Sequence, residues 1–205
     1  MNLLKTLAAV SSMTMLSRVT GLLRESLFAR AFGASAYTDA FYVAFRLPNL
    51  LRRLFAEGAF SQAFVPILFE YKSQKGEDET KKLVDSVATC LLWATMLISV
   101  VGIVTAPWLI VLVMGESSGT PDSFNVAVVM TRWMFPYITC MSFVALAGGI
   151  LNTWSQFKIP AFTPVLLNIS FIFASLVLVD YLEQPIYAMA VAVCVGGLLQ
   201  VGIQI

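Results

Sequence analysis

Long apolar stretches separated by short polar segments run through the whole chain. A helix that crosses a bilayer needs about 20 residues, because each residue adds about 1.5 Å along the helix axis. By this measure the pattern predicts six spanning helices, over residues 6–32, 36–70, 82–114, 123–152, 160–180 and 185–205. The predicted fold class is therefore all-α, a polytopic membrane protein. Pro48, Pro107 and Pro136 mark the expected kinks in the three longest segments.

The predicted connections are short, and their charges differ from one to the next. Lysines occur in the segment before the first span and in the connections at residues 72–82 and 154–160. The connections at 115–122 and 180–185 have no Lys or Arg, and all their charged residues are acidic. Cytoplasmic loops of membrane proteins are enriched in Lys and Arg, so the N-terminus is predicted to be cytoplasmic. Arg30, near the first outer turn, is the one exception. The acidic run at residues 77–79 is interpreted as a solvated loop.

Ionisable side chains interrupt the first two apolar segments. The first holds Arg18, Arg24 and Glu25, and the second holds Arg46, Arg52, Arg53 and Glu57, with Asp39 at its outer end. Each charge at the bilayer centre is unfavourable by about 2.5–3.5 kcal/mol on insertion scales. Helices with such charges cannot face lipid on all sides. We expect them to line a wet cavity or to be shielded by neighbouring helices.

If the first two segments form a hairpin that turns near residues 33–36, residues equally far from the turn lie at the same depth in the membrane. In such a hairpin three pairs lie at similar depth: Arg18 with Arg52, Arg24 with Arg46, and Arg30 with Asp39. We therefore predict that Arg30 and Asp39 form an ion pair or gate at the outer end. The alternative for Asp39 is an acid near a helix N-terminus, where the helix dipole favours it.

The balance of charge at membrane depth favours an anionic ligand. With Arg132 included, six arginines (18, 24, 46, 52, 53 and 132) stand against three carboxylates (25, 39 and 57). The alternative is that these arginines and carboxylates pair with one another for structural reasons. Such pairing tends toward equal numbers of the two, and here three arginines are left over. The planar guanidinium fork binds two phosphate oxygens at once. Arg132 itself is equally consistent with an interfacial anchor and with a cavity arginine.

Composition narrows the function classes further. The chain of 205 residues is 59% hydrophobic and 12% charged, whereas soluble domains carry about 25% charged residues. It has no histidine and three widely separated cysteines, so no metal site, disulfide framework or cofactor is expected. No catalytic group and no nucleic-acid partner is expected. The last apolar run ends at residue 205 without a polar flank, so we expect this chain to be one lobe of a longer protein.

Three blocks of the sequence are similar to the MurJ/MviN family of lipid II flippases. They are residues 17–25 (SRVTGLLRE), residues 39–60 (DAFYVAFRLPNLLRRLFAEGAF), and the Gly-Ile-Leu-Asn and Pro-Ala-Phe-Thr-Pro motifs within residues 149–168. The resemblance covers the whole chain, and the second block is the most specific.

The resemblance implies the N-terminal six-helix lobe of a two-lobed exporter-superfamily flippase in the bacterial inner membrane. Its cargo would be lipid II, an undecaprenyl-pyrophosphate-linked disaccharide-peptide, and its other lobe would be the missing C-terminal half. The family's cavity residues map to Arg18, Arg24, Arg52 and Asp39. Two alternatives remain open: another exporter of drugs or polyprenyl-linked glycans, and a membrane-embedded enzyme of lipid-linked glycan metabolism. The absence of histidine and the short loops disfavour the enzyme.

Overall fold

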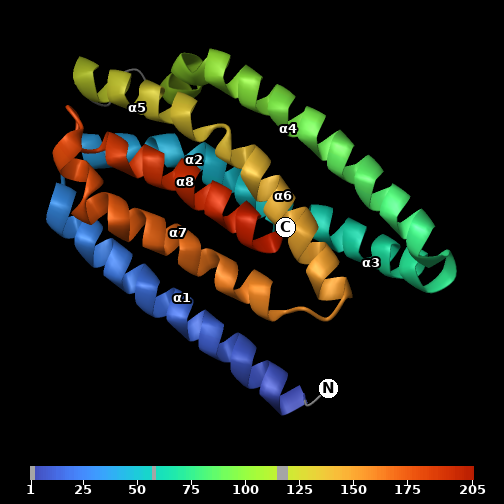
Figure 1. Ribbon diagram of the computed structural model, residues 1–205. Coiled ribbons are helices and arrows are strands. Elements are labelled where there is room, and N and C mark those ends of the chain that lie inside the picture. The colour runs from blue at the N-terminus through green and yellow to red at the C-terminus, as the bar shows by residue number, and fades with distance from the viewer. Residues whose placement is uncertain (1–2, 57–58, 115–119) are drawn as a thin grey trace.

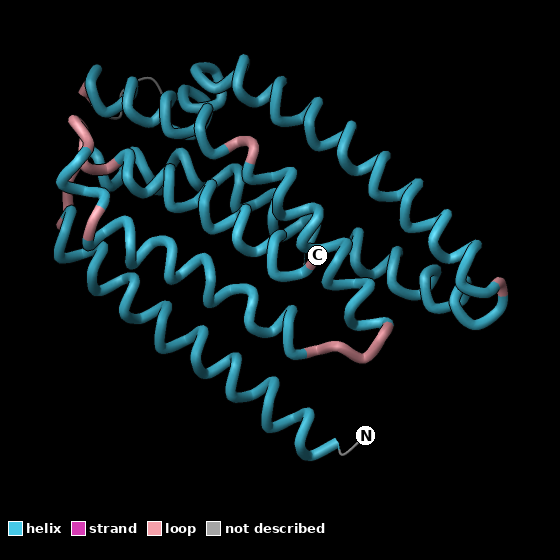
Figure 2. Tube along the Cα trace, in the orientation of Figure 1, coloured by secondary structure: helices cyan, strands magenta, loops and turns pink. Residues whose placement is uncertain are grey.

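The computed structural model describes residues 3–56, 59–114 and 120–205, and these residues form helices without any strand (Figures 1 and 2). The helices are α1 (Leu3–Phe32), α2 (Ala36–Ala56), α3 (Ala59–Gln74), α4 (Gly76–Met114), α5 (Pro121–Met134), α6 (Tyr137–Thr153), α7 (Lys158–Leu176) and α8 (Tyr187–Gln204), with a short 3₁₀ helix, η1, at Leu178–Tyr181. The prediction of an all-α membrane protein is confirmed.

Within the described residues, five helical segments are long and apolar enough to cross a membrane. They are Thr6–Phe32, Gly76–Met114, Pro121–Thr153, Lys158–Leu176 and Tyr187–Gln204. The predicted span 123–152 corresponds to α5 and α6 together, which meet at a turn at residues 135–136 because Pro136 has no amide hydrogen to continue the helix. The predicted span 36–70 corresponds to α2 and α3, with residues 57–58 outside the described part.

The predicted connection at residues 72–82 is wrong in its length. Helix α3 continues to Gln74 and α4 begins at Gly76, so that only a turn at Lys75 separates them. Gly76 has a φ of 83°, a left-handed conformation that suits glycine. The acidic run that was expected to be a loop forms the first turn of α4, where carboxylates stabilise the positive end of the helix dipole. Glu79 also accepts a hydrogen bond from Lys82, 2.8 Å away.

The helices form a bundle with α1 and α4 on opposite flanks (Figure 1). Helix α7 packs against α1 on one side and α8 on the other, and α8 also packs against α6. The hairpin of α1 and α2 assumed from the sequence holds only near its turn, where the Phe28 ring lies 5.5 Å from the rings of Phe41 and Tyr42. Farther from the turn α1 follows α7, so depth matching between α1 and α2 does not bring their side chains together.

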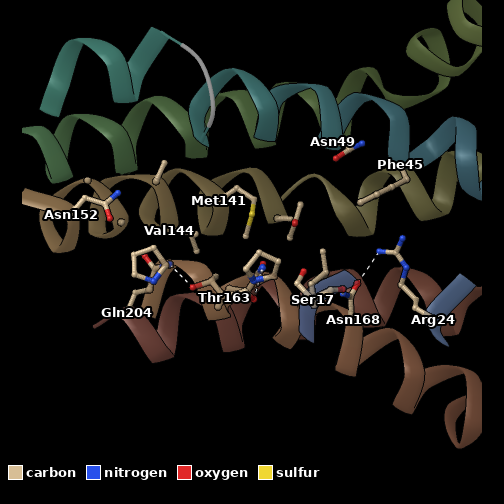
Figure 3. A pocket seen from close by; sticks show the side chains of 18 of the residues that line it. Ser17, Arg24, Phe45, Asn49, Met141, Val144, Asn152, Thr163, Asn168 and Gln204 are labelled. Atoms are coloured by element: carbon tan, nitrogen blue, oxygen red, sulfur yellow. Dashed lines mark hydrogen bonds between the residues drawn. The ribbon is translucent and has the colours of Figure 1, made fainter. Parts of the chain in front are cut away.

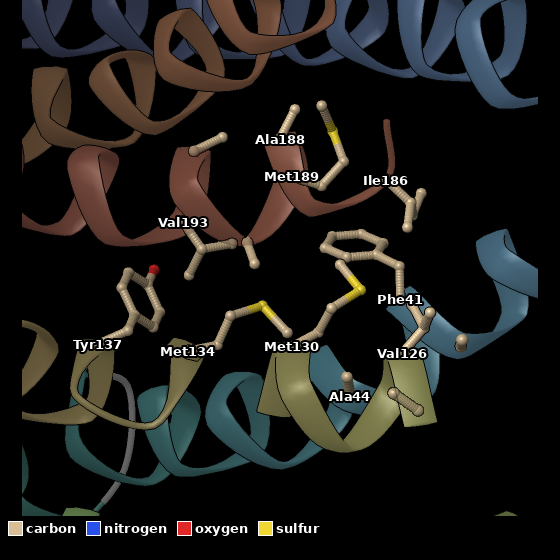
Figure 4. Close-up of a cluster of buried hydrophobic side chains, with 14 of the residues drawn as sticks. Phe41, Ala44, Val126, Met130, Met134, Tyr137, Ile186, Ala188, Met189 and Val193 are labelled. Atoms are coloured by element: carbon tan, nitrogen blue, oxygen red, sulfur yellow. The ribbon is translucent and has the colours of Figure 1, made fainter. Parts of the chain in front are cut away.

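Methionines and aromatic rings fill the core between α2, α5 and α8. Met130, Met134 and Met189 are fully buried there beside Phe41 and Val193 (Figure 4). Glycines let α8 approach its neighbours closely. A Cβ atom on Gly196 would lie 2.6 Å from Leu167 Cδ1 of α7, and one on Gly197 would lie 2.7 Å from Tyr137 Cδ2 of α6. Gly196 and Gly197 therefore permit close packing of α8 against α7 and α6.

Candidate functional site

A cavity of about 580 Å³ opens between α1, α2, α3, α6, α7 and α8. Its lining combines apolar side chains with a set of polar ones (Figure 3). The polar residues are Ser17, Arg24, Asn49, Tyr137, Asn152, Thr163, Asn168, Gln200 and Gln204. No carboxylate lines this cavity among the residues that the structure describes. A polar cavity inside a bundle of apolar helices matches the expectation that charged helices border a wet space.

Arg24 supplies the positive charge of this lining. One guanidinium nitrogen, Nη1, donates a hydrogen bond of 3.2 Å to Asn168 Oδ1, and Nη2 forms an ion pair with Glu25. The guanidinium carbon also lies 5.4 Å from the centre of the Phe171 ring, within the range of a cation–π interaction. The side chain keeps 29% of its surface exposed. Arg24 is thus held in place while part of its surface remains available to a ligand.

Asn168 positions Arg24 by joining α7 to α1. Its amide nitrogen donates to the Ser17 carbonyl oxygen at 3.0 Å and to Thr20 Oγ1 at 3.1 Å, while its oxygen accepts from Arg24. Gly21 lies beside this arrangement, and a Cβ atom there would make an ordinary contact of 3.6 Å with the Asn168 nitrogen. Asn168 belongs to the motifs within residues 149–168, but the sequence did not show that it contacts Arg24.

The other predicted site residues lie outside this lining. The side chains of Arg18, Arg46 and Arg53 are exposed. The side chain of Arg52 and the whole of Glu57 lie outside the described part of the structure. Roles for Arg18 and Arg52 in ligand binding therefore stay predictions.

Arg30 and Asp39 are both exposed, and no ion pair joins these two described residues. The Asp39 amide donates a 3.1 Å hydrogen bond to the Ser35 carbonyl oxygen, within the first turn of α2. This position agrees with the alternative interpretation of an acid at a helix N-terminus. A gate formed by the pair in another conformation stays a prediction.

Arg132 has a structural partner away from the cavity. Its Nε donates a 3.2 Å hydrogen bond to the carbonyl oxygen of Ile103 in α4. This carbonyl is the one that Pro107, four residues later, leaves without a helical donor. Arg132 therefore fastens α5 to the proline site of α4, and it does not belong to the cavity lining.

Sequence reasoning missed a second polar group, made by Thr163, Gln200 and Gln204. Gln200 Nε2 donates to the Thr163 carbonyl oxygen at 3.1 Å, and Gln204 Nε2 donates to Thr163 Oγ1 at 2.7 Å. The two glutamines are four residues apart in the last apolar run, so they share one helix face. Amides at membrane depth need hydrogen-bond partners much as charges do, so this spacing in an apolar run is the sequence signal for them.

The arrangement suits binding rather than bond chemistry. The described residues contain no group of three or more Cys, Asp or Glu side chains that could hold a metal ion. The lining offers one guanidinium, several amides and hydroxyls, and apolar surface. Such a site can hold an anionic group and hydrogen-bond to polar substituents beside it.

Comparisons with known proteins agree with this arrangement. The family model described as "Lipid II flippase MurJ" matches residues 28–205. The chain is 58% identical over its whole length to the lipid II flippase MurJ of Burkholderia cenocepacia, and it spans 40% of that protein. It is 41% identical to the probable lipid II flippase MurJ of Vibrio cholerae, with 97% of this chain and 39% of the relative covered.

A solved structure has the same fold. It is named "Lipid II flippase MurJ, inward closed conformation" and matches with a TM-score of 0.77 and 29% identity, over 95% of this chain and 41% of that one. The resemblance inferred from the three sequence blocks is thereby confirmed. Because the family model matches most of this chain, the chain belongs to the lipid II flippase MurJ family.

Proposed function

We propose that this chain is the N-terminal lobe of a lipid II flippase of the bacterial inner membrane. The flippase moves lipid II from the cytoplasmic to the periplasmic leaflet for cell-wall synthesis. The observation that carries the proposal is Arg24, a partly exposed guanidinium in a polar cavity whose described lining has no carboxylate. No bond is made or broken, so the protein is not an enzyme. The chain spans about 40% of its relatives, and the second lobe completes the transporter.

Arg24 binds the pyrophosphate of the cargo in this proposal. Its Nη1 contacts a neutral amide oxygen, which a phosphate oxygen can replace with a stronger, charge-assisted hydrogen bond. Arg18 and Arg52 complete the anion site in the full-length protein. The polyprenyl tail stays in the bilayer while the head group enters the cavity. Rocking of one lobe against the other then exposes the head group to each side in turn.

The proposed orientation places the N-terminus in the cytoplasm. The N-terminus, the α3–α4 turn and the α6–α7 connection lie at one end of the bundle (Figure 1). Lys72 at the end of α3 donates to the Thr153 carbonyl oxygen at 3.0 Å, and its Nζ lies 4.2 Å from the centre of the Trp154 ring. The lysine-containing connections therefore gather at one end, as the positive-inside rule expects of a cytoplasmic face.

The test is complementation by the full-length protein after depletion of the native one. Arg24→Ala should abolish growth and leave lipid II in the cytoplasmic leaflet, while membrane abundance stays normal. Arg24→Lys separates charge from bidentate geometry, since lysine is a point charge without the planar fork. Lys81→Ala is the control for loss of a positive charge outside the cavity. Normal lipid II flipping by Arg24→Ala at normal abundance would overturn the proposal.

A further inference from the structure

Two buried acceptor atoms in the cavity wall have no hydrogen-bond donor. They are the side-chain oxygens of Gln200 and Gln204, whose residues are 5% and 9% exposed. Both belong to the lining of the cavity, and neither oxygen has a hydrogen-bond partner in the described structure. Buried polar atoms are nearly always paired in folded proteins. Two such atoms on one helix face of a binding cavity therefore point to a missing partner.

The orientation of both amides is determined by Thr163. Its hydroxyl donates to the Ile159 carbonyl oxygen at 2.9 Å, so Thr163 Oγ1 is left to accept from Gln204 Nε2. The Thr163 carbonyl oxygen can only accept, and it takes its bond from Gln200 Nε2. Rotating the Gln200 amide by 180° would set oxygen against oxygen, and rotating the Gln204 amide would require the Thr163 hydroxyl to give up its bond to the Ile159 carbonyl oxygen. In this arrangement both side chains present their oxygens away from Thr163.

Gly148 of α6 lies beside Gln204, and both residues line the cavity. The nearest atom to a Cβ built on Gly148 of α6 would be Gln204 Oε1, at 3.7 Å (Figure 3 shows Gln204 and its bond to Thr163). Gly148 itself contributes no side chain that could pair with or cover this buried oxygen. A cation is a poor match, because hard cations take six or more oxygen ligands and no carboxylate lines this part of the described cavity. A neutral hydroxyl or amide N–H group matches both oxygens.

We infer that Gln200 and Gln204 form a subsite for the uncharged hydrogen-bond donors of the cargo, the hydroxyl and amide N–H groups of its disaccharide-peptide. This inference rests on the proposed function. Arg24 binds the anionic part of the cargo, and the two amides recognise the glycan-peptide part. A site with buried acceptors discriminates against a ligand that lacks the matching donors, because the acceptors then stay unpaired.

The experiment measures binding of two lipids by the purified full-length protein. Lipid II and undecaprenyl pyrophosphate share the tail and the pyrophosphate and differ in the disaccharide-peptide. Gln200→Met and Gln204→Met should each weaken lipid II binding about 5- to 10-fold, as expected for one lost hydrogen bond. Binding of undecaprenyl pyrophosphate should change by less than about twofold. Arg24→Ala should weaken binding of both lipids.

A second pair of variants leaves the glutamines intact. Gly148→Ser adds a hydroxyl donor beside Gln204 Oε1 and should weaken lipid II binding more than Gly148→Ala, which adds only the Cβ. Thermal unfolding midpoints show whether each variant is folded. Equal effects of the glutamine variants on both lipids, or no effect, would overturn the subsite while leaving the proposed function in place. If the unmodified protein binds neither lipid, the proposed function fails and the subsite with it.

Discussion

Arg24 of α1 and Asn168 of α7 are joined by a hydrogen bond of 3.2 Å, although 144 residues separate them in sequence. The same asparagine also binds the α1 backbone at Ser17. One neutral side chain therefore fixes both the position of the cavity arginine and the packing of the helix that carries it. Glu25 already pairs with Nη2 of Arg24, whereas the neutral Asn168 leaves Nη1 without a negatively charged partner, so this nitrogen can still bind an anion.

Asn168→Asp should inactivate the full-length protein. The new carboxylate would pair with Arg24 and compete with the anionic cargo, and a hydrogen bond to a charged group contributes about 1.5–3 kcal/mol. We expect the rate of lipid II flipping in reconstituted vesicles to fall about tenfold or more. Asn125→Asp, at an exposed position of α5, is the matched control. Full activity of the Asn168→Asp protein would show that Arg24 tolerates a second carboxylate partner beside Glu25.

Glycine substitutions should separate close packing from simple helix propensity. A Cβ atom on Gly102 would overlap the Phe135 ring, and one on Gly196 would lie 3.2 Å from the Leu167 Cα atom. Gly102→Ala and Gly196→Ala should each lower stability by about 1–3 kcal/mol, since overpacking displaces neighbours. Gly202→Ala, which meets nothing within 4 Å, should be neutral or stabilising by up to about 1 kcal/mol. Thermal unfolding in detergent measures all three.

Arg132 and Pro107 should act as a coupled pair. Arg132→Ala leaves the Ile103 carbonyl oxygen without the donor that it now has. In a chain that also carries Pro107→Ala, the new amide hydrogen can donate to that carbonyl, so loss of Arg132 should matter less. We expect Arg132→Ala to destabilise by about 1–3 kcal/mol alone and by clearly less in the Pro107→Ala background. Equal effects in both backgrounds would mean that the hydrogen bond contributes nothing to stability.

The orientation of the bundle can be tested with single cysteines. Cys90, Cys140 and Cys194 are first replaced, and a cysteine is then placed at Ser35 or at Ser73. The lysines near Ser73 predict that it is cytoplasmic and that Ser35 is periplasmic. An impermeant thiol reagent should label the Ser35 position, and not the Ser73 position, in intact spheroplasts. The reverse pattern would invert the proposed topology.

The gate predicted from Arg30 and Asp39 requires another conformation, because no ion pair joins the two side chains here. Asp39→Asn and Arg30→Ala should each reduce complementation if the pair forms during transport. Exchanging the two charges should then restore part of the activity. If the exchanged protein is as inactive as the single variants, with normal abundance, Asp39 acts only at the N-terminus of α2.

The sequence by itself determined the class of protein, the approximate helices and the family. Apolar length and the prolines indicated most of the spans because a bilayer imposes one helix length, and Arg24 stood out because charge at membrane depth is unfavourable. The first turn of α4 was misread because an acidic run is compatible with both a loop and a helix N-terminus. Local pattern cannot decide between these two.

Only the tertiary structure decided which polar groups meet. Arg24 lies beside Asn168 because α1 follows α7, and helix periodicity carries no information about which helix is the neighbour. Arg132 lies at the Ile103 carbonyl because α5 packs against the proline site of α4, and charge counting had left that residue open. Gln200 and Gln204 became conspicuous once Thr163 was seen to hold both amide nitrogens, since an unpaired acceptor can be recognised only when all its neighbours are known.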